Sequence, residues 1–188
     1  DSRISAEFLR AGAGFGGSCF PKDVKALAAA AKKSNVESLM LKATLEVNEI
    51  QPKIVVQMAK ERLGIIKGKK IAILGLTFKP ETDDVRESRS EIVVNELISE
   101  GANVIAHDPK GMANFREIID IEMAPTPELA TKNSDCVIIM TEWNEYKKMD
   151  LEKMLENMTG NVLIDGRRAL NFKEVEKLGF DYKTIGLG

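Results

Sequence analysis

Residues 69–78 read KKIAILGLTF, a short run of aliphatic and β-branched residues behind two lysines. Such a run is typical of a strand that is buried on both faces of a parallel sheet. Four more candidate strands follow along the chain: NVIAHDP (103–109), SDCVIIMTEW (134–143), NVLIDGRR (161–168) and DYKTIGLG (181–188). The segments between them have helical patterns. Strands that alternate with helices predict parallel βαβ units and a doubly wound sheet.

Two of the intervening helices carry clear end signals. SEIVVNELISEGA (90–102) has an amphipathic pattern, and Gly101 is its stop signal. In PTPELATKN (125–133), Thr126 is placed to cap a short helix and Pro127 to occupy its first turn. These signals place helices between the predicted strands.

Before residue 67 the pattern is helical. Apolar residues from Val24 to Ala31 recur at i, i+3, i+4 and i+7, which predicts a helix that begins at Asp23. A second helix is expected to begin near Ser38, with a kink, or a break and a restart, at Pro52.

The chain is therefore expected to be an α/β protein in two parts. Residues 1–66 form a central helical segment with a glycine-rich loop, and residues 67–188 form a Rossmann-like domain with a doubly wound parallel sheet. Ligands of such sheets bind at the carboxyl ends of the strands. This rule points to GLTFKPETDD, HDP, TEW and DGRR.

Composition narrows the class of protein. The 188 residues are 44% hydrophobic and 30% charged, as in ordinary globular proteins. A net charge of −2 gives no attraction to nucleic acid or anionic membrane, and no apolar run is long enough to span a bilayer. Cys19 and Cys136 lie in different contexts, which argues against a disulfide framework and favours the cytoplasm.

The stretch GFGGSCFPKD (14–23) places a cysteine among glycines, a serine and a proline. Backbone amides of the following helix and Lys22 are placed to stabilise a Cys19 thiolate. Asp23 is a candidate base or water-orienting group, and Lys22 is a candidate counter-charge for an oxyanion. The alternative is a tight turn with an incidental cysteine.

The loop GLTFKPETDDVRESRS (75–90) follows the first strand but lacks G-x-G-x-x-G, because Gly75 stands alone. Bound NAD is therefore not predicted here in the usual way. Lys79, Arg86 and Arg89 suit a phosphate ligand, although a solvated charged loop fits the same composition.

Other candidates lie at the ends of the later strands. Arg167 and Arg168 suit two-point binding of phosphate or carboxylate, or equally surface ion pairs. His107 has no partners for a zinc or triad role, so a structural role is expected. Cys136 is expected in the core, and Trp143 in the core rather than lining a pocket.

Taken together and in this order, the motifs resemble the C-terminal part of the UDP-glucose/GDP-mannose dehydrogenase family. FLRAGAGFGGSCFPKDVKAL (8–27) resembles its catalytic-cysteine stretch, ILGLTFKPETDDVRESRS (73–90) the start of its UDP-binding domain, and IDGRR (164–168) a later substrate-contacting motif.

The resemblance implies oxidation of the C6 alcohol of a nucleotide sugar to a carboxylate with two NAD+ and no metal, with UDP-glucose as the expected substrate. Cys19 would form a thiohemiacetal and then a thioester, Asp23 would help to activate or position water, and Lys22 would contact cofactor or substrate. Arg86 would reach the NAD phosphates. The implied substrate-binding residues are Arg3, Phe8, Leu9, Arg10, Gly14, Phe15, Gly16, Gly17, Phe78, Lys79 and Arg167.

The resemblance also implies a homodimer through the helices of residues 23–64, with Arg3 reaching the neighbouring subunit's substrate. The family's NAD-binding domain, which would bind most of the cofactor, is expected to precede this part and to be absent from this chain. The chain alone is therefore expected to be inactive. That the sequence opens with Asp1 rather than Met fits the later portion of a longer protein.

Three alternatives stay open. GDP-mannose or a UDP-N-acetyl sugar is an alternative substrate. A non-catalytic nucleotide-sugar-binding module is a second, against which Cys19, Lys22 and Asp23 together argue. A thiol enzyme of another fold, such as an aldehyde dehydrogenase, is a third, but it has no evident need of the TFKPETDDVRES loop.

Overall fold

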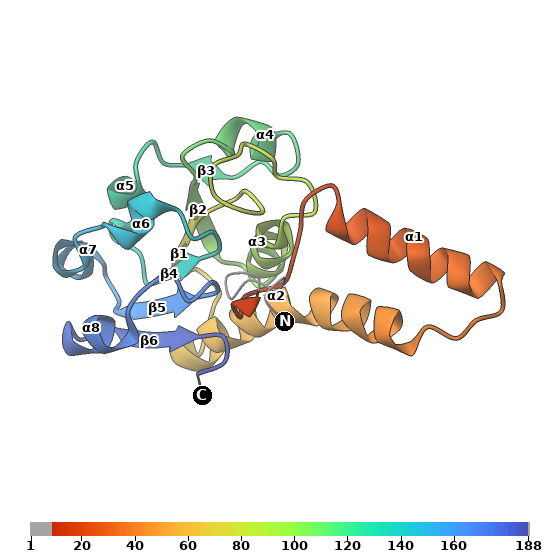
Figure 1. Ribbon diagram of the computed structural model, residues 1–188. Helices are drawn as coiled ribbons and strands as arrows, with labels where there is room; N and C mark the ends of the chain where they lie inside the picture. Colours follow the sequence, from red (N-terminus) through yellow and green to blue (C-terminus); the bar gives the residue numbers. More distant parts are fainter. Residues whose placement is uncertain (1–8, 188) are drawn as a thin grey trace.

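The computed structural model describes residues 9–187, an α/β fold with two helices ahead of a sheet (Figure 1). Helices α1 (Phe20–Lys33) and α2 (Leu39–Leu63) come first. The strands are β1 (Lys70–Leu74), β2 (Asn103–His107), β3 (Glu122–Met123), β4 (Cys136–Ile139), β5 (Val162–Asp165) and β6 (Asp181–Thr184). The helices among them are α3 (Arg89–Ser99), α4 (Met112–Arg116), α5 (Pro127–Thr131), α6 (Asn144–Lys147), α7 (Leu151–Asn157) and α8 (Phe172–Lys177).

The sheet has the order β3-β2-β1-β4-β5-β6, and every pair is parallel. This is the doubly wound order of Rossmann-like sheets, so the predicted fold class is confirmed. Strand β3 was not predicted, because two residues are too few to show a period. In the register, Leu74 lies beside His107 and Ile139, and Ile139 beside Asp165. Four strands therefore end at one edge.

Alternate side chains of the strands pack into two separate cores. Ile71 and Ile73 of β1 lie in the core under α2, α3 and α4, whereas Ala72 and Leu74 lie in the core under α5, α6, α7 and α8. Successive side chains of a strand point to opposite faces, so both faces need a cover of helices. Figure 1 shows α2 and α3 on one side of the sheet and α5 to α8 on the other.

The two N-terminal helices differ from prediction at one point each. Helix α1 begins at Phe20, not at Asp23, because Pro21 fits the first turn of a helix, where its missing N–H costs nothing. Helix α2 begins after Ser38 as expected and is one continuous helix through Pro52, so the predicted break and restart is wrong, whereas the predicted kink stays a prediction. Pro52 is buried, and the next turns place Val55 in the core, so packing offsets the hydrogen bond that proline removes.

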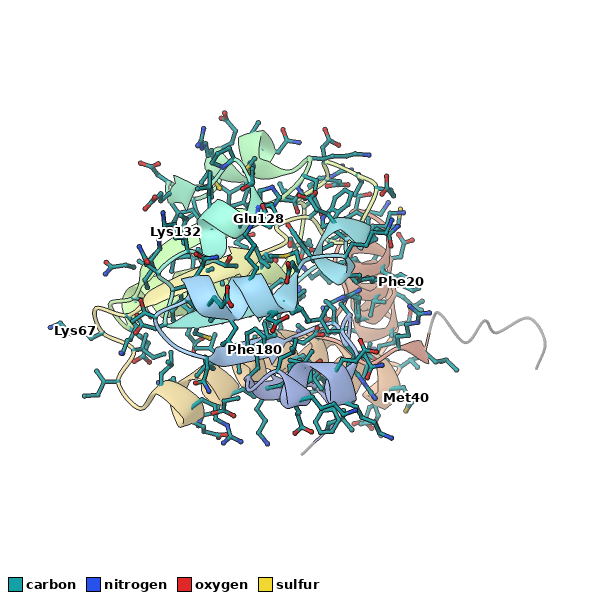
Figure 2. All side chains as sticks on the ribbon, turned by 90° about the vertical axis from the view of Figure 1, so that its left-hand side faces the viewer. Phe20, Met40, Lys67, Glu128, Lys132 and Phe180 are labelled. Atoms are coloured by element: carbon teal, nitrogen blue, oxygen red, sulfur yellow. The ribbon has the colours of Figure 1, made fainter. Side chains whose placement is uncertain are left out.

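Helix α1 and the first half of α2 form a hairpin that projects from the sheet (Figure 1). The second half of α2 instead belongs to the sheet's core, through Val55, Val56 and Ala59. Figure 2 labels Phe20 and Met40 on the hairpin and Phe180 within the body of the protein. Within residues 9–187, no helix is long and apolar enough to cross a membrane.

Candidate functional site

The glycine-rich loop of residues 12–17 lies across the carboxyl edge of the sheet. The N–H of Ala13 donates to the carbonyl of Gly166, after β5, at 2.8 Å. The N–H of Gly17 donates to the carbonyl of Arg86, in the loop after β1, at 2.9 Å. The loop that leads to Cys19 is therefore attached to both of the motifs that the sequence singled out downstream.

A third attachment comes from α2. The amide of Asn48 accepts the N–H of Phe15 at 2.7 Å and donates to the carbonyl of Phe15 at 3.1 Å. Asn48 is buried, with 5% of its surface exposed. Sequence reasoning missed this residue: a polar residue inside an otherwise amphipathic helix was the available signal, but its partner lies 33 residues away.

Two glycines of the loop are required by close approach. A Cβ at Gly16 would lie 2.3 Å from the carbonyl oxygen of Glu87. A Cβ at Gly17 would lie 2.7 Å from the ring of Phe78, and Gly17 also has φ +84°. Contacts this short exclude any side chain, so glycine is needed where the loop meets the segment after β1.

Cys19 directly precedes α1, at the N-cap position, and is exposed. Its Sγ lies 3.7 Å from the hydroxyl of Ser18, and its carbonyl accepts the N–H of Asp23 at 2.9 Å. Negative charge is favoured beside a helix N-terminus, which suits a nucleophilic thiolate. Lys22 and Asp23 lie in the first turn as an exposed ion pair of 3.5 Å.

Arg86 lies beside the loop that leads to Cys19, because its carbonyl accepts the N–H of Gly17. Its guanidinium binds the carboxylate of Asp84 in two-point fashion, at 2.9 and 2.7 Å, and its side chain is 68% exposed. The pKa of Arg86 is raised by the hydrogen bond to Asp84 first, and then by the negative charge of the same carboxylate. The same hydrogen bond lowers the pKa of Asp84.

Phe78 and Lys79 lie in the same loop, beside the glycines. Phe78 is half-buried against Gly17, and the Lys79 ammonium lies 5.4 Å from the centre of the Phe78 ring. Lys79 is exposed. The loop thus presents one anchored aromatic ring and two exposed cations, Lys79 and Arg86.

Arg89, a third cation of this loop, is a structural residue and not a candidate for phosphate binding. Only 7% of its surface is exposed, and its guanidinium binds Glu87 at 3.2 Å and Glu49 of α2 at 3.3 Å. Lys25 of α1 binds Glu87 from the other side at 2.7 Å. Hydrogen bonding and charge from Lys25 lower the pKa of Glu87 and outweigh its partial burial. The network ties α1, α2 and the loop together.

Arg167 joins the end of β5 to the glycine loop. Its Nε and Nη2 donate to Glu142, at 2.7 and 3.2 Å, and its Nη1 donates to the carbonyl of Gly14 at 3.3 Å. Burial alone would raise the pKa of Glu142, but the hydrogen bond and charge of Arg167 outweigh it and lower that pKa. Arg168 is exposed and has φ +52°.

The buried carboxylate of Asp108 holds the strand ends in place. It accepts hydrogen bonds from the backbone of Leu76 and Thr77 after β1, from Gly111 after β2, and from the indole of Trp143 after β4. Asp108 is fully buried. It is committed to structure and is not available to a ligand.

The expected structural residues lie in the protein interior. His107 is buried, and its Nδ1 lies 3.1 Å from the hydroxyl of Tyr146; burial lowers the pKa of His107. Cys136 and Trp143 are buried in the cores, and burial raises the pKa of Cys136. Their predicted structural roles are confirmed.

Two predicted residues, Arg3 and Phe8, lie outside the described residues. Leu9 and Arg10 are described and exposed, at the start of the glycine-rich segment. Residues 9–187 hold no cluster of three or more histidine, cysteine or acidic side chains placed to bind a metal.

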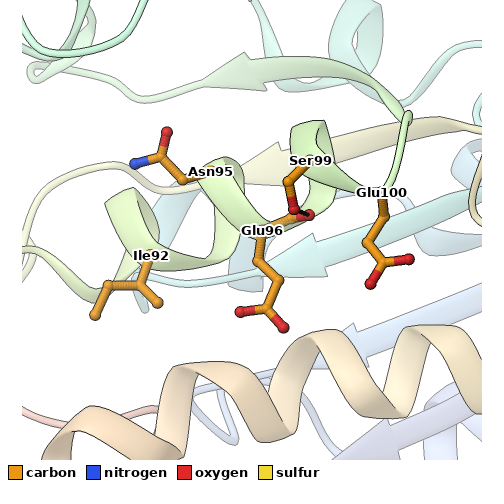
Figure 3. A pocket seen from close by; sticks show the side chains of 5 residues that line it. All are labelled: Ile92, Asn95, Glu96, Ser99 and Glu100. Carbon is orange, nitrogen blue, oxygen red and sulfur yellow. Dashed lines mark hydrogen bonds between the residues drawn. The ribbon is translucent and has the colours of Figure 1, made fainter.

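A depression of about 400 Å³ on α3 lies apart from the predicted site residues (Figure 3). Its lining residues are Ile92, Asn95, Glu96, Ser99 and Glu100. Figure 3 shows Glu96 and Glu100 directed toward α2, where Lys60 binds Glu100 at 2.6 Å. All of these residues belong to α3 or to the residue that directly follows it, so the depression is a feature of the surface of one helix.

The chain matches two models of one protein family. Residues 72–172 match the UDP-binding domain of the UDP-glucose/GDP-mannose dehydrogenase family, and residues 1–50 match the central domain of the same family.

Similar proteins carry related names. The UDP-glucose 6-dehydrogenase AglM of Haloferax volcanii is 40% identical over 186 residues, which cover 98% of this chain and 42% of that protein. The structure of a UDP-glucose dehydrogenase from Pyrobaculum islandicum matches with a TM-score of 0.81 at 39% identity, over 91% of this chain and 40% of that one. An NDP-N-acetyl-D-galactosaminuronic acid dehydrogenase from Methanosarcina mazei matches with a TM-score of 0.80 at 28% identity, over 93% and 39%.

The chain thus spans less than half the length of these relatives. The UDP-binding model covers more than half of the chain, and the fold agrees with that of the solved relatives. The chain belongs to the UDP-glucose/GDP-mannose dehydrogenase family.

Proposed function

We propose that this chain is the C-terminal part of an NAD-dependent dehydrogenase that oxidises UDP-glucose to UDP-glucuronate in the cytoplasm. One observation carries the proposal: the loop that leads to exposed Cys19 is hydrogen-bonded to the segments of Arg86 and Gly166 at the carboxyl edge of the sheet. Ligands of doubly wound sheets bind at this edge. This arrangement supports a thiol and a nucleotide-sugar site within one small region.

Cys19 is the proposed nucleophile. After the alcohol has lost a hydride and a proton, the Cys19 thiolate attacks the aldehyde carbon, and the resulting alkoxide takes up a proton to give a thiohemiacetal. Loss of a second hydride and a proton gives a thioester. Water, positioned by Asp23, adds to the thioester carbon and the C–S bond breaks. The sugar leaves as a carboxylate, the thiolate is restored, and the two protons of the water pass through Asp23 to solvent. Lys22 offers positive charge to the oxyanions of these steps.

The nucleotide sugar is proposed to lie at the carboxyl edge of the sheet, beside the contact between the glycine loop and the loop after β1. Exposed Lys79 and partly exposed Arg167 suit the diphosphate, and Phe78 suits the base or ribose. The remaining proposed contacts are Phe8, Leu9 and Arg10, and the loop residues Gly14, Phe15, Gly16 and Gly17. Arg3 is proposed to reach the substrate of the neighbouring subunit.

NAD, when bound, would accept one hydride at each oxidation. The described residues do not fit a dinucleotide in the usual Rossmann position: a Cβ at Gly75 would lie 2.5 Å from Thr141, and the carboxylate of Asp108 is fully used. Arg86, exposed and near Cys19, does fit a cofactor phosphate that approaches from outside the sheet. We therefore propose that Arg86 is the contact of this chain with the NAD phosphates, that Lys22 contacts cofactor or substrate, and that the chain does not reduce NAD by itself.

A homodimer is proposed through the projecting hairpin. The hairpin exposes large apolar side chains over both helices: Phe20, Leu27, Val36, Leu39, Met40, Val47 and Ile50. Exposed apolar surface of this extent is typical of an interaction surface. A second copy of the same hairpin is the proposed cover.

The alternative substrates are GDP-mannose and a UDP-N-acetyl sugar. The similarity to the Methanosarcina mazei protein supports the UDP-N-acetyl sugar as an alternative substrate. The identity of 39–40% to proteins named for UDP-glucose favours UDP-glucose.

The decisive experiment uses the full-length protein. UDP-glucose should produce two NADH per sugar oxidised, and Cys19→Ser should abolish net oxidation to the carboxylate while leaving UDP-glucose binding intact. Cys136→Ser, a matched change at a buried thiol outside the site, should retain the same stoichiometry. Unchanged turnover in Cys19→Ser would refute the proposed mechanism. Binding of nucleotide sugar without any oxidation would favour the non-catalytic module.

A further inference from the structure

The ion pair between Glu142 and Arg167 carries an inference that rests on the proposed function. Glu142 follows β4 and Arg167 follows β5, so neighbouring parallel strands deliver the two side chains to the same edge. The pair is bidentate, at 2.7 and 3.2 Å, and both side chains are about three-quarters buried, with 22% exposed for Arg167 and 25% for Glu142. A bidentate pair fixes the plane of the guanidinium as well as its position.

The pair leaves part of the guanidinium unused. Glu142 and the carbonyl of Gly14 accept from Nε, Nη2 and Nη1, which accounts for three of the five N–H donors of arginine. Within residues 9–187 the other two donors, one on Nη1 and one on Nη2, make no hydrogen bond. These two N–H groups, which we call the free edge, lie on neighbouring nitrogens of one guanidinium and suit a phosphate or carboxylate ligand.

The same guanidinium also contacts the glycine loop. Besides the bond to Gly14, Nη1 lies 3.1 Å from the position of a Cβ at Gly12. The orientation that Glu142 imposes therefore decides two things together: where the free edge of Arg167 points, and how the loop leading to Cys19 is held.

We propose that Glu142 is a positioning residue: it fixes the Arg167 guanidinium side-on, so that the free edge binds the diphosphate of the nucleotide sugar while Nη1 holds the glycine loop. Glu142 makes no contact with the substrate itself. An arginine without this partner would keep its charge but lose its fixed plane, and with it the two-point contact.

The test is calorimetric titration of UDP-glucose into the full-length protein and its variants. Glu142→Gln removes the charge and one of the two acceptors, and should weaken binding about tenfold, which corresponds to about 1.4 kcal/mol. Arg167→Lys keeps the charge without the fork and should weaken binding at least as much. In the Arg167→Lys background, Glu142→Gln should have no further effect, because it acts through the fork. Glu145→Gln, a nearby change at an exposed glutamate, should leave binding unchanged.

A second readout separates positioning from general stability. If Glu142 only stabilised the fold, Glu142→Gln would lower the unfolding temperature without changing the KM for UDP-glucose measured below that temperature. A rise in KM in step with the loss of affinity is the expected result. Should the Gln variant fold poorly, Glu142→Asp, which keeps the charge on a shorter side chain, is used instead, and its unfolding temperature and KM are compared with those of the wild type.

The outcomes distinguish this inference from the function on which it rests. If the wild-type protein binds UDP-glucose and Glu142→Gln binds it equally well or more tightly, the inference alone is overturned. The same holds if Glu142→Gln weakens binding as much in the Arg167→Lys background as it does in the wild type. Failure of the wild-type protein to bind any UDP or GDP sugar would overturn the proposed function and the inference with it.

Discussion

Single side chains decide how the glycine loop is held. Asn48 bridges both backbone groups of Phe15 from a buried position, so each lost hydrogen bond would leave a peptide group poorly satisfied. Asn48→Ala should lower the free energy of unfolding by about 2 kcal/mol, measured by urea denaturation. It should also speed proteolysis within the loop.

The matched control is Asn114→Ala, which removes a single exposed hydrogen bond to the carbonyl of Asp83. That change should cost no more than about 0.5 kcal/mol. If the two variants lose the same free energy of unfolding, the buried hydrogen bonds of Asn48 stabilise the protein no more than an exposed hydrogen bond does.

Glu142 should make stability depend on pH in a defined window. Its pKa is lowered in the folded protein from the ordinary value of 4.5, because the hydrogen bond and charge of Arg167 outweigh its burial. The folded state therefore holds the proton less tightly than the unfolded state, and the stabilisation is complete above pH 4.5. It should be lost as pH falls through the lower, folded-state pKa.

The measurement is the free energy of unfolding of wild type and Glu142→Gln across pH 3 to 7. The two should differ most at neutral pH and converge at acidic pH. A constant difference across this range would mean that the charge of Glu142 is not what stabilises the pair. Glu152→Gln, at an exposed position in α7, should track the wild type throughout.

Among the secondary-structure elements, Asp108 connects three strand ends through one carboxylate. Oδ2 accepts from Leu76, Thr77 and Trp143, and Oδ1 accepts from Lys110 and Gly111. Asp108→Asn would set an N–H group against at least two donors, and should cost about 3 kcal/mol of unfolding free energy.

Asp120→Asn supplies the control for this change, since Asp120 is exposed and should tolerate the substitution within about 0.5 kcal/mol. The Asp108→Asn variant should also bind UDP-glucose more weakly, because Phe78 and Lys79 directly follow the segment that Asp108 holds. Full stability together with full binding in this variant would show that the strand ends are held by other contacts.

The parts of the fold that local patterns encode were predictable. Five apolar runs predicted five of the six strands and their parallel order, because a strand buried on both faces leaves a continuous signal in the sequence. Strand β3 has only two residues, which are too few to form such an apolar run. Continuity of α2 through Pro52 depends on burial against the sheet, which a helical pattern does not report.

The site was predictable as a set of motifs but not as a set of contacts. The motifs around Cys19, Phe78 and Arg167 were identifiable in the sequence, and the fold brings their backbones together. Their supporting residues, Asn48 and Glu142, are ordinary polar residues whose partners are distant along the chain. The rule for strand ends pointed to the TEW segment that contains Glu142, but only the tertiary fold reveals the contacts of Asn48 and Glu142. It also shows that Arg89 forms ion pairs with Glu49 and Glu87 of the same chain.

At the scale of the whole molecule, two halves of one helix meet different environments. The second half of α2 is packed into the sheet's core, whereas its first half and α1 project outward with apolar side chains exposed. A rigid base with an apolar projection is suited to pairing, because the projection need not become ordered when it binds. The proposed cover of the projection is a second hairpin.

Charge placed on this surface should separate the copies. Leu27 on α1 is 58% exposed and Met40 on α2 is 81% exposed. In Leu27→Glu with Met40→Glu, the mass in solution should fall from that of a dimer to that of a monomer, as measured by light scattering after size-exclusion chromatography. Burying an unpaired carboxylate at each changed position would cost the interface several kcal/mol.

Ile65→Glu serves as the control, because Ile65 is 72% exposed but follows α2 at the base, away from the hairpin. That variant should keep the dimer mass. If the hairpin variant remains a dimer, the copies pair through another surface; if the wild-type protein is already a monomer, the exposed apolar side chains have another purpose. A monomer that still binds UDP-glucose would further show that the site at the carboxyl edge of the sheet is complete within one copy.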